Sequence, residues 1–499
     1  GGNSRQNIHK KIRKEWPKDR PDFLRFVLYK ENMDTTTATK EVNRRGSTGR
    51  IGYAGMKDKR GITTQFCTLY RTTPDQIVTS TSARNNSKKN RNKNNRQDDN
   101  QTPSGGGGNT KQKGVSVVQV GNFEFVHQEL RLGMLNGNRF DIVIRNIKTL
   151  HENDDSDKTE IDDGNEHVQA RRRDVLEQAA KNVKAKGFIN YFGTQRFGKF
   201  HDTHLVGIAV LKGDYRKAID ILMSPKTDDR PDVTKARQDW ENRFQNGATE
   251  DNERDAAKRV LKRMNRYMTG EISVMQSLSK RPMDYKRAFG CIPRNLRAMY
   301  IHAVQSLIWN KAASYRVSKM GNTKVLAGDL VLGEGSKYNV RAVTEEDIAV
   351  NTYSMEDIVI PSVGVKTSYP TNELGSVIKS MMGDIGITAD MFKKVQDREL
   401  ILNGDYRKVI CHPTDFDYEI KEYYDPLQPL LQTDLMKLHG EDIRIEIPDS
   451  EEDPTEMKKN MKTAMVVGFT LPSSSYATIA LRELMKLPTS NEFQKDQAL

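Results

Sequence analysis

The sequence predicts an α+β fold, because it contains both runs of strand length and segments with helical spacing. Residues 26–29 form an apolar run of strand length, and residues 63–70 are rich in β-formers after a charged turn. Between residues 296 and 307, apolar side chains recur at helical spacing, which predicts a helix with one face in a core. A chain of 499 residues is long enough for two or three domains.

Further elements are expected on both sides of this helix. Residues 115–146 read as two or three strands, and residues 173–186 as a helix that ends at Gly187. Residues 325–365 are richer in Val, Gly and β-formers, which predicts a small sheet. Two strands are expected at residues 443–447 and 464–469, followed by a helix with Ser475 as its N-cap.

Two polar inserts interrupt the predicted elements. Residues 79–114 contain a basic, Asn-rich run and a block of four glycines, with almost nothing to bury, so we expect disorder. Their cations could bind RNA or a nuclear-import receptor, or the insert could lack a function. The second insert, at about residues 151–167, is largely acidic, and we expect it to be solvated.

The charge balance favours a polyanionic partner. Lys plus Arg number 80 against 67 Asp plus Glu, which gives a net charge of +13. The cysteines Cys67, Cys291 and Cys411 lie far apart and form no CxxC pair, so neither a disulfide framework nor a zinc site is indicated. A reducing compartment fits this pattern. No run of about 18 apolar residues occurs, so we expect no membrane span, and the first residues lack an apolar signal core.

The segment of residues 52–65 is the most informative part of the sequence. It places Asp58 between Lys57 and Lys59, followed by Arg60. A carboxylate held between cations is stabilised in its charged form, so we expect Asp58 to be ionised and able to act as a nucleophile, base or metal ligand. The cations could also bind a phosphate backbone. The alternative is a solvated turn in which these charges keep a loop soluble.

A second segment, residues 190–198, combines three aromatics, two glycines, two amides and an arginine. Gly193 allows unusual backbone angles or the close approach of a ligand. Phe192 could stack on a nucleobase, and Asn190 and Arg196 could bind its edge or a phosphate. The same residues could equally form an ordinary turn between a helix and a strand with a buried aromatic.

These two segments, in this order, closely resemble the TruD family of pseudouridine synthases. The resemblance continues in four further collinear segments, at residues 26–35, 130–140, 293–310 and 471–484. The Lys-Glu-Asn-x-Asp-Thr form of residues 30–35 and the long inserts resemble the eukaryotic branch of the family.

The resemblance implies a pseudouridine-synthase catalytic core with a mixed, mostly antiparallel sheet and an inserted TRUD domain. Residues 1–205 and 426–499 would form the catalytic core, and residues 206–425 the TRUD domain, with a basic cleft for RNA between them. The expected partners are tRNA and also small nuclear RNA and mRNA. We expect a monomer in the nucleus, with the cytoplasm as a second location.

The implied reaction isomerises uridine to pseudouridine and requires neither a nucleotide cofactor nor a metal. By motif position, Asp58 matches the catalytic carboxylate, as a nucleophile or a general base at the sugar. Phe192 matches the aromatic that stacks on the target base, and Asn190 matches its hydrogen-bonding companion. Gly193, Lys57 and Arg196 are expected to bind substrate or support the loops that do.

One family feature is not found in the sequence. Family members carry an N-terminal strand segment that supplies a basic residue near the catalytic Asp, but residues 23–28 already match the element that follows it. The cationic partner of Asp58 is therefore left unassigned.

The main alternative is a non-catalytic RNA-binding or RNA-chaperone protein that keeps the fold, which would need the basic cleft but not Asp58. A metal-dependent nuclease would need a carboxylate cluster, and none accompanies the basic motifs.

Overall fold

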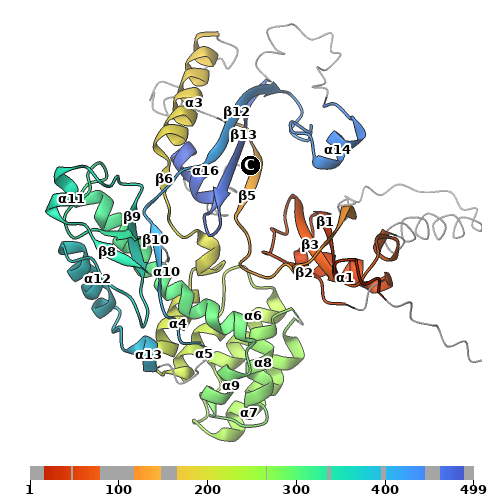
Figure 1. The fold of residues 1–499 in the computed structure, drawn as a ribbon. Helices are drawn as coiled ribbons and strands as arrows, with labels where there is room; N and C mark the ends of the chain where they lie inside the picture. Colours follow the sequence, from red (N-terminus) through yellow and green to blue (C-terminus); the bar gives the residue numbers. More distant parts are fainter. Residues whose placement is uncertain are drawn as a thin grey trace, which may run out of the picture. The chain divides into compact units, whose positions relative to one another are not determined.

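The computed structural model describes eight ranges of the chain: residues 16–46, 49–78, 117–147, 166–265, 267–333, 339–394, 400–443 and 461–487 (Figure 1). Two compact units are present. Unit 1 comprises residues 1–138 and 432–443, and unit 2 comprises residues 139–431 and 444–499. The predicted basic insert lies outside the described residues, as do the acidic insert up to residue 165 and the strand expected after residue 443.

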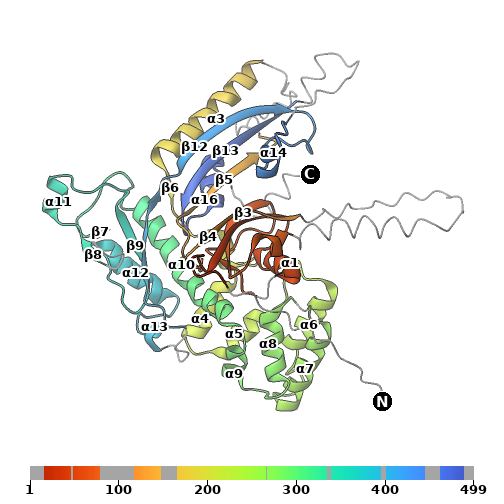
Figure 2. The same cartoon turned by 45° about the vertical axis from the view of Figure 1, so that its right-hand side comes forward.

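Unit 1 contains a four-stranded antiparallel sheet in the order β2-β3-β1-β4. Strands β3 and β4 of this sheet are labelled in Figure 2. Its strands are β1 (Phe23–Glu31), β2 (Gly52–Tyr53), β3 (Ile62–Tyr70) and β4 (Val118–Val126). Side chains alternate across β1, and Leu24, Phe26 and Leu28 pack with Ala38 and Val42 of helix α1 (Thr35–Gly46) in one core. The predicted strands at residues 26–29 and 63–70 are confirmed.

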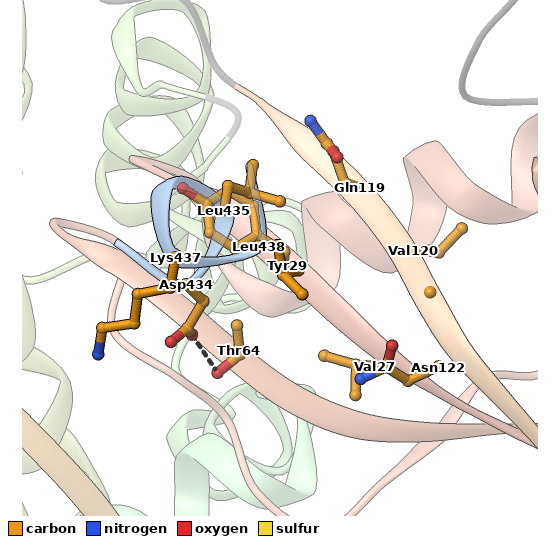
Figure 3. A pocket seen from close by; sticks show the side chains of 11 residues that line it. Val27, Tyr29, Thr64, Gln119, Val120, Asn122, Asp434, Leu435, Lys437 and Leu438 are labelled. Carbon is orange, nitrogen blue, oxygen red and sulfur yellow. Dashed lines mark hydrogen bonds between the residues drawn. The ribbon is translucent and has the colours of Figure 1, made fainter. Parts of the chain in front are cut away.

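Helix α14 (Asp434–His439) belongs to unit 1 with the rest of residues 432–443, although the chain before residue 432 and after residue 443 belongs to unit 2. It covers the sheet beside β1 and β3, where the Thr64 hydroxyl donates a hydrogen bond of 3.2 Å to Asp434. A pocket of about 520 Å³ lies between this helix and the strands (Figure 3). Its lining is mostly apolar and includes Val27, Tyr29 and Leu435.

Unit 2 contains a three-stranded sheet with its own core. The strand order is β12 (Thr414–Tyr423), β13 (Lys462–Pro472), β5 (Gly137–Ile144). Helices α3 (Glu166–Lys186) and α16 (Ala477–Met485) pack beside it (Figure 1). A two-stranded ladder of β6 (Phe188–Ile189) and β11 (Ile410–Cys411) adjoins this core.

The larger core of unit 2 is built mainly by helices. It contains α4 (Thr203–Leu211), α5 (Tyr215–Met223), α6 (Pro231–Glu241), α7 (Glu250–Arg263), α8 (Thr269–Leu278), α9 (Tyr285–Gly290), α10 (Arg294–Ser318) and α12 (Glu373–Asp384). A sheet in the order β10 (Asp405–Lys408), β9 (Ile358–Ser362), β7 (Leu330–Leu332), β8 (Val340–Ala342) packs against α10. Shorter helices are η2 (Thr194–Phe197), α11 (Glu345–Ala349) and α13 (Met391–Lys394).

The predicted helix near residues 296–307 and the small sheet near 325–365 are thus confirmed, as is the α+β class. The helical core begins at Val206 and ends at Val409, whereas the second core resumes at Cys411. The domain boundaries at residues 205 and 425 stay a prediction.

Three smaller outcomes follow. The predicted helix cap is wrong: α16 begins at Ala477 with Tyr476 as its N-cap, and the Ser475 hydroxyl instead donates a hydrogen bond to Asn190. The three cysteines are free thiols. Among the described helices, none has the length and apolar character needed to cross a membrane.

Candidate active-site residues

Asp58 lies in the loop between β2 and β3 of unit 1, and its side chain is exposed. The backbone around it is held from three elements, α1, β1 and β3. The Lys57 backbone N–H donates to the hydroxyl of Thr35 at 3.0 Å, and the main-chain oxygen of Asp58 accepts from the Lys30 amine at 2.5 Å. Gln65 on β3 donates to the oxygen of Gly55 in the same loop. The loop is therefore anchored while the carboxylate of Asp58 faces solvent.

Lys30 is the cation that the fold brings to this loop. It follows the buried side chains of Leu24, Phe26 and Leu28 at the same alternating positions of β1 and has no exposed surface. Burial lowers the pKa of its amine, and the charges of Asp58 and Asp34 oppose that shift. Lys30 is thus a buried cation that binds the backbone of the Asp58 loop.

The flanking lysines do not clamp the carboxylate as the sequence suggested. The amine of Lys57 hydrogen-bonds to the side-chain oxygen of Asn138, and burial lowers its pKa. Among the described residues, no hydrogen bond or ion pair reaches the carboxylate of Asp58 itself. Lys57 supports the loop, and its binding of phosphate stays a prediction.

Glycine is required at both ends of the Asp58 loop. A Cβ on Gly52 would lie 2.4 Å from the main-chain oxygen of Leu130, and Gly61 has a φ of +124°. The chain enters β3 through that left-handed residue, next to a backbone hydrogen bond from Asn32 to Gly61. These constraints restrict the conformations open to the segment that carries Asp58.

The second predicted segment follows β6 in unit 2. Asn190 is buried, and its amide is used within the protein: the oxygen accepts from Arg407 at 2.6 Å and from Ser475 at 3.2 Å, and the nitrogen donates to the oxygen of Lys408. Its role as a hydrogen-bonding companion of a base stays a prediction, while its role in holding this segment is direct.

Phe192 is half-buried within an aromatic group. Its ring meets Trp309 edge to face, with centroids 5.6 Å apart, and Tyr476 at 6.3 Å. Asn310 on α10 holds its backbone in both directions, accepting from the N–H at 2.8 Å and donating to the oxygen at 3.0 Å. The position of the ring is therefore set by α10, even though the residue lies outside any helix or strand.

Two guanidinium groups lie against the Phe192 ring. The guanidinium carbon of Arg407 is 4.3 Å from the ring centroid, and that of Arg196 is 5.5 Å from it. Gly193 lets Tyr476 approach, because a Cβ there would lie 2.8 Å from a ring carbon of that tyrosine. The predicted residues Asn190, Phe192, Gly193 and Arg196 are thus gathered in one place.

The predicted site residues fall into two groups, with Lys57 and Asp58 in unit 1 and the remaining four in unit 2. Sequence reasoning missed the contributions of four residues: Lys30, Trp309, Arg407 and Tyr476. A lysine at a buried position of an alternating strand was the available signal for Lys30. No sequence signal pointed to Arg407, because 217 positions separate it from Asn190 and its strand has only four residues.

The described residues contain no group of three or more His, Cys, Asp or Glu side chains arranged to hold a metal ion.

Both groups of candidate site residues lie within segments that match one protein family. The sequence model of the TruD family, tRNA pseudouridine synthase D, matches residues 6–97 and 109–484. Multisubstrate pseudouridine synthase 7 of Schizosaccharomyces pombe is 31% identical to this chain over 99% of its length. The human pseudouridylate synthase 7 homolog is 32% identical over 95% of the chain. The chain spans 68% and 60% of the lengths of these two relatives.

The fold also has a counterpart among solved structures. The crystal structure of the tRNA pseudouridine synthase D (TruD) protein of Methanosarcina mazei superposes with a TM-score of 0.58 at 22% identity. That superposition covers 94% of this chain and 88% of the other. At this identity the likeness establishes the fold, while the family model and the relatives establish the membership. This chain belongs to the TruD family of pseudouridine synthases.

Proposed function

We propose that this chain isomerises uridine to pseudouridine in RNA, with tRNA among its substrates and small nuclear RNA and mRNA as further ones. The observation that carries the proposal is the exposed carboxylate of Asp58 on a loop whose backbone Thr35 and Lys30 hold. A carboxylate presented from an anchored backbone can be positioned against the ribose of a bound nucleotide.

The chemistry assigned to Asp58 is attack on, or proton removal from, the ribose of the target uridine. The bond between C1′ and N1 breaks, the uracil turns, and C1′ rejoins it at C5. The proton at C5 is lost and N1 gains one, so the product is an isomer of the substrate. Since no electrons or phosphoryl groups are transferred, we assign no cofactor to the reaction.

The target base must leave its stack to reach a carboxylate, and an aromatic platform supports a base in that state. We assign this role to Phe192, whose ring is held by Asn310 and by its aromatic neighbours. Asn190 and Gly193 would hold the segment, and Arg196 and Lys57 would contact the RNA. A monomeric state and a nuclear location, with the cytoplasm second, belong to the same proposal.

The test is conversion of unmodified tRNA transcripts and of total RNA by the parent chain and by Asp58→Ala. Nucleoside chromatography should detect pseudouridine with the parent chain and none with the variant. Asp434→Ala is the matched control, because Asp434 is another exposed aspartate of unit 1 and its replacement should retain the parent rate. A parent chain that binds RNA but converts none would identify a non-catalytic RNA-binding protein instead.

A further inference from the structure

Arg407 carries a buried positive charge next to Phe192. Its side chain is only 9% exposed, and its donors bind neutral oxygens. Nε donates to the main-chain oxygen of Asn190 at 2.7 Å, Nη2 to the amide oxygen of the same residue at 2.6 Å, and Nη1 to the oxygen of Ser474 at 2.6 Å. Burial lowers its pKa to about 10, so the group is still charged at neutral pH.

This arrangement differs from that of other buried arginines in unit 2. Arg316 contacts the carboxylate of Asp329 at 2.7 Å, and Arg237 contacts that of Asp229 at 2.8 Å. No Asp or Glu among the described residues forms an ion pair with Arg407. Burying a charge without a counter-ion is unfavourable, so a well-packed apolar residue would stabilise this position better. The retained charge calls for a functional explanation.

The charge lies against the face of an aromatic ring that we assign to the target base. The guanidinium carbon is 4.3 Å from the centroid of Phe192, and 5.4 and 5.9 Å from those of Trp309 and Tyr476. The face of an aromatic ring is negative and attracts the cation. By drawing electron density toward itself, the cation makes the ring a better stacking partner for an electron-rich base.

The reaction produces such a base. When the bond between C1′ and N1 breaks, its electron pair stays on the uracil, which carries negative charge until C5 bonds to the sugar. We propose that Arg407 is a positioning residue that fixes Asn190 and Phe192 and, through the Phe192 ring, stabilises the uracil anion more than the neutral uridine. This inference rests on the proposed function, because it assigns the target uracil to that ring.

The test compares a uridine RNA with the same RNA carrying 5-fluorouridine at the target position. Fluorine stabilises the uracil anion, so the reaction on the second RNA depends less on an external cation. Single-turnover loss of the target nucleoside should fall roughly ten- to a hundredfold in Arg407→Met on uridine RNA. On fluorouridine RNA, the factor by which Arg407→Met slows the reaction should be several times smaller. Thermal melting identifies how much of the variant is folded.

A double-mutant cycle and one control variant keep the inference testable if Arg407→Met does not fold. Arg407→Lys keeps a charge but lacks the planar fork that binds Asn190, and it should be combined with Phe192→Leu. Because Arg407 acts through the ring, the fold-reduction in turnover of the double variant should be smaller than the product of the fold-reductions of the two single variants. Arg316→Lys is the control, at a buried arginine with a carboxylate partner. It should slow the reaction on both RNAs by the same factor or leave both rates unchanged.

Two results would overturn the role of Arg407 while leaving the synthase activity in place. One is an equal fold-reduction in rate on both RNAs for folded Arg407→Met. The other is a double variant whose fold-reduction equals the product of the two single ones. Absence of product from the parent chain would instead overturn the proposed function, and the inference with it.

Discussion

The side-chain amine of Lys30 donates a hydrogen bond of 2.5 Å to the main-chain oxygen of Asp58. The cation next to the Asp58 loop therefore binds the backbone, and the carboxylate remains exposed. An interaction of this kind fixes the backbone position of the aspartate and adds a nearby positive charge. It leaves both carboxylate oxygens free for the role that we propose.

Lys30→Met should separate turnover from stability. The apolar side chain fills a similar volume and removes a buried charge, so the free energy of unfolding should stay the same or rise by about 1 kcal/mol. Turnover should fall roughly a hundredfold, because misplacement of a reacting group by about 1 Å has effects of that size. Urea unfolding and single-turnover rates on the same preparations measure both quantities. A variant as active as the parent would remove Lys30 from the site.

The same variant should change the pH dependence of stability. Burial lowers the folded-state pKa of Lys30 below its ordinary value of 10.5, so between these two values the unfolded chain binds a proton that the folded chain does not. The contribution of Lys30 to the free energy of unfolding therefore rises with pH across this window. Subtracting the Lys30→Met curve from the parent curve between pH 7 and about 10.5 should leave a positive slope.

Phe192→Leu should lower turnover by roughly ten- to a hundredfold, because stacking on an aromatic is worth about 1–3 kcal/mol per base. Leucine retains most of the apolar volume between Trp309 and Tyr476, so melting should change little. Phe192→Tyr keeps the ring and should be mild. If Phe192 serves only as a core residue, Phe192→Leu will keep normal activity per folded molecule, whereas Phe192→Ala will destabilise the chain by about 3–5 kcal/mol.

Gly193→Ala should damage the aromatic group, because its new Cβ would lie 2.8 Å from a ring carbon of Tyr476. We expect a loss of stability of about 1–3 kcal/mol and a lower turnover per folded molecule. Gly290→Ala is the control: a Cβ there has no neighbour within 4 Å, and alanine favours the end of α9. Equal melting temperatures for the two variants would show that the approach of Tyr476 does not require glycine.

RNA affinity should depend strongly on salt, since the net charge of +13 predicts several contacts with phosphates. Each neutralised phosphate should steepen the slope of log affinity against log salt by about 0.7 for a single strand. A titration series between low and high salt measures the number of contacts. A flat dependence would place the excess charge away from the RNA.

Periodicity explains which parts of the fold were predictable. Strands β1 and β3 and helix α10 each bury residues at regular spacing, so local sequence indicated them. The N-cap of α16 was missed by one residue, because Ser475 looks like a helix cap but hydrogen-bonds to Asn190, 285 positions away. A competing long-range partner cannot be read from a local motif.

The candidate site was predictable only in part. Asp58 and Phe192, to which we assign the catalytic and stacking roles, lie in conspicuous local motifs. Their supports do not: Arg407 and Trp309 come from distant elements and meet Phe192 only through the packing of α10 against β9, which pairs with β10. Lys30 lies between these cases, since its burial follows from strand alternation but its hydrogen bond to Asp58 does not.

The most direct measurement uses one uridine-containing RNA labelled with tritium at C5, on which binding and chemistry are followed together. Asp58→Asn keeps the size of the side chain and removes its charge, so the dissociation constant should hold or fall while tritium release disappears. The parent chain should release tritium from the target uridine with formation of pseudouridine. Release by Asp58→Asn at anything near the parent rate would contradict the assignment of Asp58 as the catalytic carboxylate.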